Sequence, residues 1–511
     1  MHSLTDEEIV RLAESVGIEV PESQLETVRS YVNENLAGLG DVDEIDVETP
    51  LEPTGDRSWW TPSASENEHD GIVTRCDVPP TDSNDGTLSG VTVGAKDIIA
   101  VAGVPMECGS ETMIGYVPGR DAIVIERLRE AGATISAKTN LDEFAGGARS
   151  ISHHGEMRNP YDRSRIPGGS SGGSAIAVAT GQVDVALGTD TGGSVRMPSS
   201  HCGIVGLKQS YGLVPLTGVV ENTYTIDHVG PMTSSVADAA AVLDAIAGKN
   251  RTDPASMRAA GRDEYAVGGY TDAVEAAPDI SDVTIGVVPE GLGDGAAEDE
   301  VDSTVVEHTE GTIDRLVDAG ATVKEVPIYA WEAAGPIKRT LSYTELAAHW
   351  RDRGAPIRRG GVVDEGYQAD FAARTRANGS LAGDYYLARM IAGAFLLEEK
   401  KGRTYTRAHA ARRALERDLR EALEEVDALA TPTVAGLAPT REEADDPGLS
   451  YSRNTRPANV TGLPAISIPS GTSAGLPIGF QLMAGAFDDA ALLATAASVE
   501  SVIATGAGEK A

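Results

Sequence analysis

Segments with strand character alternate with segments with helix character from Val91 almost to the end of the chain. Short apolar runs typical of buried strands occur at 91–95, 133–137, 182–188, 283–288, 321–326, 465–470 and 479–483. Helical patterns lie between or after them, as at 121–131 and 488–501. Because this alternation extends over about 400 residues, it favours one large α/β unit over a series of small modules.

The first ~40 residues are predicted to form two helices that precede this unit. Thr5 and Glu8 have the spacing of a capping box, and Gly17 can end the first helix in the left-handed conformation. An acidic stretch (41–52) and a polar loop follow. We therefore expect residues 1–70 to be a helical appendage with a linker, and residues 71–511 to be the main domain.

The charge of the chain limits its partners. Acidic residues number 78 against 42 basic ones, which gives a formal net charge of −36. Such a surface repels phosphate backbones and anionic lipids, so we expect neither a nucleic-acid nor a membrane partner. Only nine of the basic residues are Lys. This balance suits a cytosol at high salt, and we expect a halophilic protein.

The cysteines and the first residues indicate the compartment. Cys76, Cys108 and Cys202 form no CxxC pair, so we expect no disulfide framework and a reducing environment. The N-terminus has no basic and apolar segments of the signal-peptide type, and no apolar run approaches the ~20 residues that span a bilayer. The sequence therefore predicts a cytoplasmic protein.

A run of small residues at 166–208 implies tight turns and close approach of backbone amides to a ligand. A phosphate-binding loop is disfavoured because Ser174 stands where such a loop needs Lys. The G-x-S-x-G spacing of a hydrolase elbow is present at 168–172, but a polar loop precedes it instead of a strand. A purely structural connection does not explain why two serine–glycine clusters flank the predicted strand 182–188.

A fourth interpretation is a serine hydrolase whose base is Lys. Lys96 ends a predicted strand, and the apolar residues that follow can bury its ammonium group. A buried Lys beside hydroxyls loses its proton more easily and can then act as a general base for Ser170 or Ser194. Asp97 would keep the proton on Lys96 if it faced it, but neighbours on a strand point to opposite faces.

Three stretches carry a family resemblance: VGAKDIIAVAGVP (93–105), GGSSGGSAIAVATG (168–181) and GTDTGGSVRMPSSHCGIVGLK (188–208). They are similar to the defining region of the amidase signature hydrolases. The resemblance extends from about Leu88 to Glu500 and is weakest between about 255 and 450. It implies the amidase signature fold, an α/β fold with a large mixed β-sheet core covered by helices on both faces.

The resemblance also implies roles for single residues. Ser194 would be the nucleophile that forms the acyl-enzyme, Lys96 the base, and Ser170 the relay between them, held by a cis peptide bond. Four backbone N–H groups would form the oxyanion hole, those of Thr191, Gly192, Gly193 and Ser194. Three further residues would support this centre: Ser171, Asp190 and Arg196. Lys138 and Lys208 match family positions as well, and we interpret them as structural.

The implied activity is hydrolysis of a linear carboxylic amide to carboxylate and ammonia. The N-terminal helices and the stretch TIDHVGPM (225–232) favour a stand-alone amidase, similar to amidases of nitrile and amide catabolism. The alternative is the A subunit of the glutamyl-tRNA(Gln)/aspartyl-tRNA(Asn) amidotransferase, which is a glutaminase. It is disfavoured because 451–459 lacks the acidic residue that binds glutamine in those proteins. A non-catalytic amide-binding member is a third alternative, against which the intact Lys96, Ser170 and Ser194 argue.

The expected partner is a small-molecule amide, with a homodimer as a possible assembly and with no cofactor and no metal. We interpret His153 and His154 as a loop or surface feature, because the sequence has no H-x-x-x-H motif or Cys/His cluster. Aromatic residues of the weakly matching middle segment are candidates for the substrate pocket, with core packing as the simpler interpretation of each: Trp331, Tyr343, Trp350, Tyr385 and Tyr386.

Overall fold

The structure is a computed structural model, and it describes residues 3–38, 57–81, 86–295, 301–357, 365–446 and 451–507. The chain divides into two compact units, residues 1–51 and 52–511. The acidic stretch expected at 41–52 lies outside the described residues.

The small unit contains the two predicted helices, α1 (Asp6–Ser15) and α2 (Glu22–Gly38). The capping box is present: the Glu8 N–H donates to the Thr5 hydroxyl at 3.3 Å, and the Thr5 N–H donates to the Glu8 carboxylate at 2.8 Å. Gly17 follows α1 with a φ of +75°. This conformation favours glycine and ends the helix where the sequence predicts.

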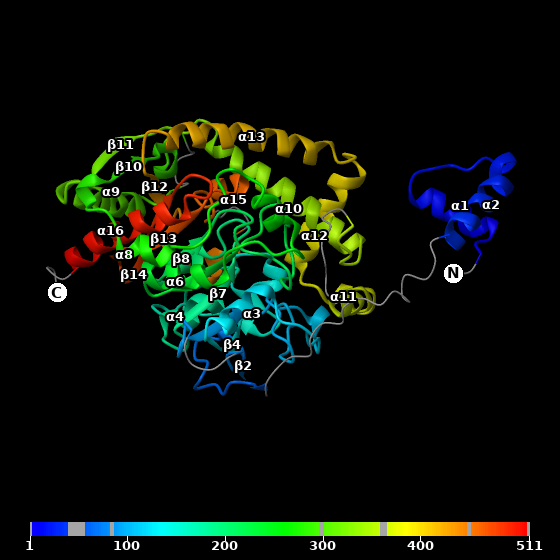
Figure 1. Cartoon of the computed structure of the whole chain (residues 1–511), viewed down its shortest axis with the longest axis horizontal. Coiled ribbons are helices and arrows are strands. Elements are labelled where there is room, and N and C mark those ends of the chain that lie inside the picture. The colour runs from blue at the N-terminus through cyan, green and yellow to red at the C-terminus, as the bar shows by residue number, and fades with distance from the viewer. Residues whose placement is uncertain are drawn as a thin grey trace. The chain divides into compact units, whose positions relative to one another are not determined.

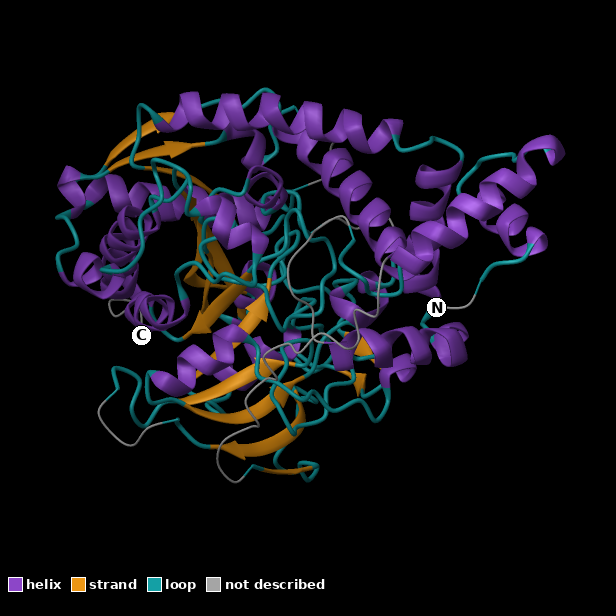
Figure 2. Cartoon of the chain, turned by 45° about the vertical axis from the view of Figure 1, so that its right-hand side comes forward, coloured by secondary structure: helices purple, strands orange, loops and turns teal. Residues whose placement is uncertain are grey.

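A twelve-stranded mixed sheet runs through the large unit, in the order β1-β2-β4-β3-β7-β9-β8-β13-β14-β12-β10-β11 (Figures 1 and 2). Its strands are β1 (Ser58–Trp60), β2 (Ile72–Val78), β3 (Thr92–Lys96), β4 (Thr134–Thr139), β7 (Val185–Thr189), β8 (Val205–Lys208), β9 (Val229–Thr233), β10 (Thr284–Val287), β11 (Thr322–Glu325), β12 (Ala428–Pro432), β13 (Ala465–Ser473) and β14 (Leu476–Met483). β5 (Ile151–Ser152) and β6 (Gly155–Glu156) form a separate small hairpin. All seven strands predicted from apolar runs are present.

Helices cover both faces of the sheet, as the sequence predicts. In β7, Val185 and Leu187 belong to one apolar cluster and Ala186 to another, because side chains alternate along a strand. The Ala186 cluster packs against α4 (Gly172–Ala179) and α5 (Arg196–Cys202). The cluster on the opposite face includes residues from α3 (Ile123–Glu130), α6 (Val236–Ile246) and α16 (Asp489–Ala507).

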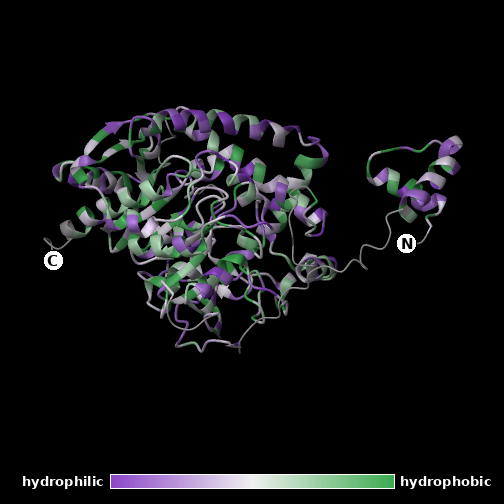
Figure 3. Cartoon of the chain, viewed as in Figure 1, coloured by the Kyte–Doolittle hydropathy of each residue, from purple (hydrophilic) through white to green (hydrophobic). Residues whose placement is uncertain are grey.

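The remaining helices are α7 (Pro254–Ala259), α8 (Tyr270–Glu275), α9 (Ser303–Asp318), α10 (Ala334–Arg351), α11 (Glu365–Asn378), α12 (Asp384–Glu398), α13 (Arg403–Leu423), α14 (Arg441–Ala444) and α15 (Arg456–Thr461). The long α13 is mainly hydrophilic (Figure 3), and it buries Ala408, Leu415 and Leu419. Such a one-sided apolar stripe is typical of a helix that covers a core.

Two other predictions can be compared with the structure. Cys76, Cys108 and Cys202 are all buried free thiols. Among the described residues, no helix combines the length and the apolar character that crossing a membrane requires.

Candidate active site

The three residues assigned to catalysis come from three successive strand-to-helix connections. Lys96 is the last residue of β3, Ser170 precedes α4, and Ser194 lies between β7 and α5. β3 and β7 are parallel neighbours in the sheet, so their carboxyl ends lie at the same edge. This edge is where open α/β sheets commonly place a binding site.

The Lys96 ammonium nitrogen is fully buried among three hydroxyls. Its Nζ lies 2.8 Å from Ser170 Oγ, 2.8 Å from Ser171 Oγ and 2.8 Å from Thr189 Oγ1. Sequence reasoning missed Thr189, although the parallel pairing of β3 and β7 brings their ends together. Ser171, which the sequence analysis expects only to support the centre, is thus in direct contact with Lys96.

The protons around Lys96 can be assigned from these contacts. The Ser171 hydroxyl donates to the Thr189 carbonyl at 3.2 Å, so it accepts from Lys96. A neutral amine donates two hydrogen bonds and accepts one through its lone pair. The Ser170 hydroxyl has no other partner among the described residues, so it is well placed to donate to that lone pair.

Burial lowers the pKa of Lys96 to about 7, against the opposing effect of the carboxylates of Asp142, Asp190 and Asp227. Asp97 does not reach Lys96. It forms an ion pair with Lys138 at 3.1 Å on the other side of the strand, as its position next to Lys96 predicts. The base can therefore be neutral near pH 7.

The peptide bond between Gly169 and Ser170 is cis. The Ser171 N–H donates to the Ser194 carbonyl at 3.3 Å, which holds the two serine segments side by side. The hydroxyl of Ser194, a residue that is 7% exposed, makes no hydrogen bond to any residue that the structure describes. The contact between Lys96 and Ser170 is thus formed, whereas the one between Ser170 and Ser194 is not. Catalytic hydrogen bonds often tighten only when substrate binds.

The predicted oxyanion hole needs one correction. The N–H of Gly193 donates to Asp190 Oδ1 at 2.7 Å, so Gly193 supports the loop and does not face the oxyanion. The N–H groups of Thr191, Gly192 and Ser194 make no hydrogen bond within the described part of the chain. These three remain available to a developing negative charge.

An ion pair inside the protein supports this loop. Arg196 Nε lies 3.0 Å from Asp190 Oδ2, and both side chains are fully buried. Burial would raise the pKa of Asp190, but the Arg196 guanidinium and hydrogen bonds hold it well below its usual value. Arg196 also donates to Gln481 Oε1 at 2.8 Å and to Asn459 Oδ1 at 2.7 Å. The loop between β7 and α5, which contains Ser194 and which we call the nucleophile loop (190–195), is thereby attached to the C-terminal part of the sheet.

Lys138 and Lys208 have the structural surroundings that the sequence analysis expects. Lys138 also donates to the Ile99 carbonyl at 2.7 Å. Lys208 donates to the Gln209 carbonyl at 3.0 Å and lies 3.2 Å from His228 Nε2.

Three cations near the nucleophile loop were missed by sequence reasoning. They are Lys338 of α10, Arg389 of α12 and Arg456 of α15, and we call them the cationic cluster. A Cβ built on Gly192 would lie 2.8 Å from Lys338 Cε, so Lys338 packs directly on the loop. Burial, together with the charges of Arg389 and Arg456, lowers the pKa of Lys338 to about 7. Neither Lys338 nor Arg389 forms an ion pair with a described residue.

A cavity of about 310 Å³ adjoins the Ser170 loop, and its lining includes Asp142, Gly146 and Tyr385. Asp142 Oδ2 occupies the space that a Cβ on Gly169 would need. A Cβ on Gly146 would lie 2.7 Å from Arg389 Nη1, so Arg389 packs against a segment that lines this cavity.

Of the aromatic residues proposed as candidates for the substrate pocket, two line the cavity and the others pack elsewhere. Tyr385, 47% exposed, and Tyr386 both line the cavity. Trp350 and Tyr386 pack around Phe144 in an aromatic cluster, with ring centroids 5.8 Å and 5.1 Å from it. Trp331 is buried in the core, and Tyr343 lies under the guanidinium of Arg389 at 5.4 Å.

Comparison with known proteins identifies members of one family, the amidases. The profile of the family described as Amidase matches residues 75–493. The A subunit of the glutamyl-tRNA(Gln) amidotransferase of Halobacterium salinarum is 40% identical over 422 residues, which cover 81% of this chain and 96% of that protein.

Two solved structures are similar as well. The A subunit of the glutamyl-tRNA(Gln) amidotransferase of Thermotoga maritima is 31% identical with a TM-score of 0.66, and the match covers 84% of this chain and 86% of that one. The peptide amidase of Stenotrophomonas maltophilia is 34% identical with a TM-score of 0.65, and the match covers 81% and 83%.

Proposed function

Because the chain belongs to the amidase family and is an enzyme that acts on carbon–nitrogen bonds, we propose that it hydrolyses a small primary amide through an acyl-enzyme on Ser194. The observation that carries this proposal is the buried Lys96, whose Nζ lies 2.8 Å from Ser170 Oγ and whose pKa burial lowers to about 7. We assign this chemistry to the large unit.

In the proposed reaction a proton moves from Ser194 through Ser170 to Lys96, and it later returns through Ser170. Neutral Lys96 takes the proton of Ser170, which takes the proton of Ser194 as Ser194 Oγ attacks the amide carbon. The N–H groups of Thr191, Gly192 and Ser194 stabilise the tetrahedral oxyanion, typically by a few kcal/mol per donor. The proton then returns through Ser170 to the amide nitrogen, the C–N bond breaks and ammonia leaves. Water hydrolyses the ester by the same route and releases the carboxylate.

The cationic cluster supports a substrate that carries a carboxylate. The chain has a formal charge of −36, so three cations grouped beside the nucleophile loop contrast with the negative charge of the chain as a whole. Neither Lys338 nor Arg389 has an ion pair within 4.0 Å among the described residues, and the carboxylates of Asp227 and Asp190 offset the charge around Lys338 only in part. Such charges favour an anionic ligand, because the ligand relieves their mutual repulsion.

Glutamine is the leading candidate within this class, and the proposed role is that of an amidotransferase A subunit. Its support is the match to such proteins with 40% identity over 96% of the relative's length. This evidence favours the alternative of the sequence analysis over its first choice, the stand-alone amidase. Under this proposal tRNA and further subunits become proposed partners, although the negative charge of this chain argues against direct binding of nucleic acid.

A stand-alone amidase is the second candidate, and a specific observation favours it. The segment 451–459 contains no Asp or Glu, whereas it does contain Arg456 of the cationic cluster. The peptide amidase of Stenotrophomonas maltophilia is also as similar to this chain as the Thermotoga maritima protein is.

Ammonia release from three amides tests both candidates. Glutaramate and valeramide have carbon chains of equal length, but only glutaramate carries a carboxylate; glutamine adds the amino group. A preference for glutamine over glutaramate supports the amidotransferase role, and a preference for glutaramate supports a stand-alone amidase for acidic amides. A preference for valeramide contradicts the proposed role of the cationic cluster. If no amide is cleaved and a fluorophosphonate does not label Ser194, the hydrolase proposal fails.

A further inference from the structure

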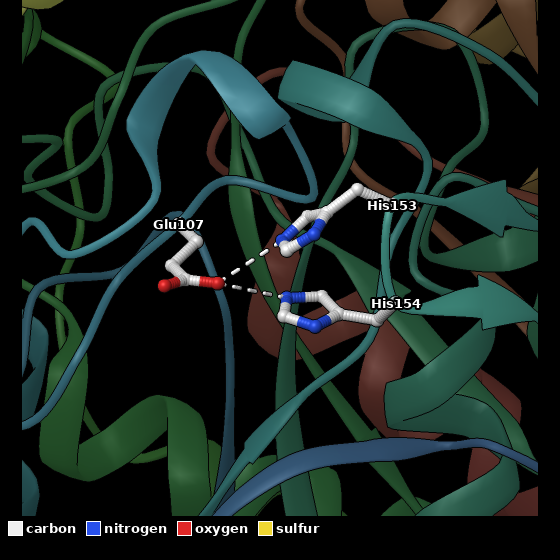
Figure 4. Close-up of side chains that lie close together, drawn as sticks. All are labelled: Glu107, His153 and His154. Atoms are coloured by element: carbon white, nitrogen blue, oxygen red, sulfur yellow. Dashed lines mark ion pairs between the residues drawn. The ribbon is translucent and has the colours of Figure 1, made fainter.

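Glu107, His153 and His154 form a cluster outside the catalytic residues (Figure 4). Glu107 Oε2 lies 3.0 Å from His153 Nε2 and 3.6 Å from His154 Nε2. The two imidazole rings lie side by side with centroids 3.7 Å apart. Sequence reasoning saw the doublet but not Glu107, which folding brings to it from the loop after β3.

The three donor atoms have the spacing of metal ligands. They all lie within 4.8 Å of one another. A tetrahedral zinc site with bonds of about 2.0–2.1 Å places its ligand atoms about 3.3 Å apart, which lies between the two distances measured from Glu107 Oε2. Both Nε2 atoms are out of contact with solvent and, apart from the contact with Glu107, have no polar partner among the described residues. Such atoms are costly to bury unless a partner binds them.

A simple ion pair explains only part of this arrangement. The short contact of 3.0 Å joins Glu107 Oε2 to His153, and His154 Nε2 is left with only the longer contact of 3.6 Å. A bound ion would give both imidazole nitrogens a partner, because imidazole nitrogen is a common metal ligand.

Two hydrogen bonds orient Glu107 without a bound ion. The Glu107 N–H donates to Asp97 Oδ2 at 2.9 Å, and Glu107 Oε1 accepts from the Gly115 N–H at 3.0 Å. This leaves Oε2 directed at the histidines. Hydrogen bonds of this kind orient ligands and raise metal affinity.

We propose that Glu107 Oε2, His153 Nε2 and His154 Nε2 bind one divalent transition-metal ion, with zinc as the expected occupant. Two imidazoles and one carboxylate are a common ligand set for zinc, and water would complete the coordination. The ion would connect the loop after β3 to the β5–β6 hairpin, at the edge of the cavity that His153 lines. Its role is structural, since the proposed proton transfers use only Lys96 and the two serines.

Zinc titration of the untagged, EDTA-dialysed protein by calorimetry tests the proposal. We expect one zinc per chain, and an affinity at least about ten-fold weaker in Glu107→Gln and in His154→Gln, since even groups behind the ligands contribute about that much. Glu111→Gln and His409→Gln are the matched controls, because they remove a nearby exposed carboxylate and a distant imidazole. Both should bind zinc like the wild type.

Cobalt provides a second readout that does not depend on stability. Cobalt bound to the wild type should give the visible absorption of a four-coordinate site, and the spectrum should be lost in both ligand variants. Absence of zinc binding in the wild type overturns the proposal. So does binding that Glu107→Gln and His154→Gln leave unchanged, which would place the ion elsewhere.

Discussion

The pH dependence of hydrolysis follows directly from the surroundings of Lys96. In the proposed mechanism the active form of Lys96 is the neutral amine, so kcat/KM should rise with pH through the pKa of about 7 to which burial lowers this group. With that pKa, Lys96 is about 1% neutral at pH 5, about half neutral at pH 7 and almost fully neutral at pH 9. A Lys with the ordinary pKa near 10.4 would be neutral in well under about 0.1% of molecules at pH 7.

Asp142→Asn is the informative perturbation, because the carboxylate of Asp142 raises the pKa of Lys96. Removing this charge should move the midpoint of the rise to lower pH by about one unit, the size of a typical effect of a neighbouring charge. At pH 9 the variant should retain activity near that of the wild type, since Lys96 is then neutral in both proteins.

The assay is ammonia release from a neutral amide between pH 5 and 9. Lys338 also has a pKa lowered to about 7, so the series is repeated in Lys338→Gln, which should keep the same rise. A midpoint that stays in place or moves upward in Asp142→Asn would refute the assignment of the base. So would a rise that disappears on replacing His201, although burial lowers the pKa of that residue to about 4.

Other predictions address the nucleophile, the substrate, the metal and the surface. Ser194→Ala should abolish ammonia release. The double variant Ser194→Ala/Lys96→Ala should be little less active than Ser194→Ala alone, because the effects of residues that act as one unit are not additive. Strictly additive losses would indicate that Lys96 acts independently of Ser194. Lys338→Gln should raise the KM for glutaramate at least about ten-fold, which corresponds to about 1.4 kcal/mol, and should leave the KM for valeramide unchanged. An equal rise in KM for both substrates would exclude a contact between Lys338 and the substrate carboxylate. EDTA should leave kcat/KM unchanged. A loss of activity that added zinc restores would show that the ion takes part in catalysis. The melting temperature should rise with salt beyond ~0.1 M, where screening of exposed charges is largely complete; a flat profile would contradict a halophilic surface.

The parts of the site that lie within continuous stretches could be predicted from the sequence. Lys96, Ser170 and Ser194 sit in segments whose glycines and serines indicate their chemistry. The strands around them were predicted as well, because buried strands leave apolar runs that local reading detects. The family resemblance assigns the Gly193 amide to the oxyanion hole, but the structure shows that this N–H donates to Asp190.

Residues whose role arises from packing could not be found in this way. Thr189 reaches Lys96 because two strands pair, and Lys338 reaches Gly192 from a helix in the weakly matching middle segment. Glu107 meets His153 although the two residues lie in separate segments of the sequence. No local pattern encodes such contacts, since they depend on how distant segments fold together.

The hydrogen bonds of Arg196 have a consequence for biosynthesis. A chain emerging from the ribosome exposes its N-terminal part first, so Ser194 and its loop are made long before Asn459 and Gln481, which hold Arg196 in place. Until residues 459 and 481 have been translated, the Arg196 guanidinium lacks these two acceptors. The unfinished polypeptide therefore carries Lys96, Ser170 and Ser194 before the C-terminal residues that complete the hydrogen bonds of Arg196 exist.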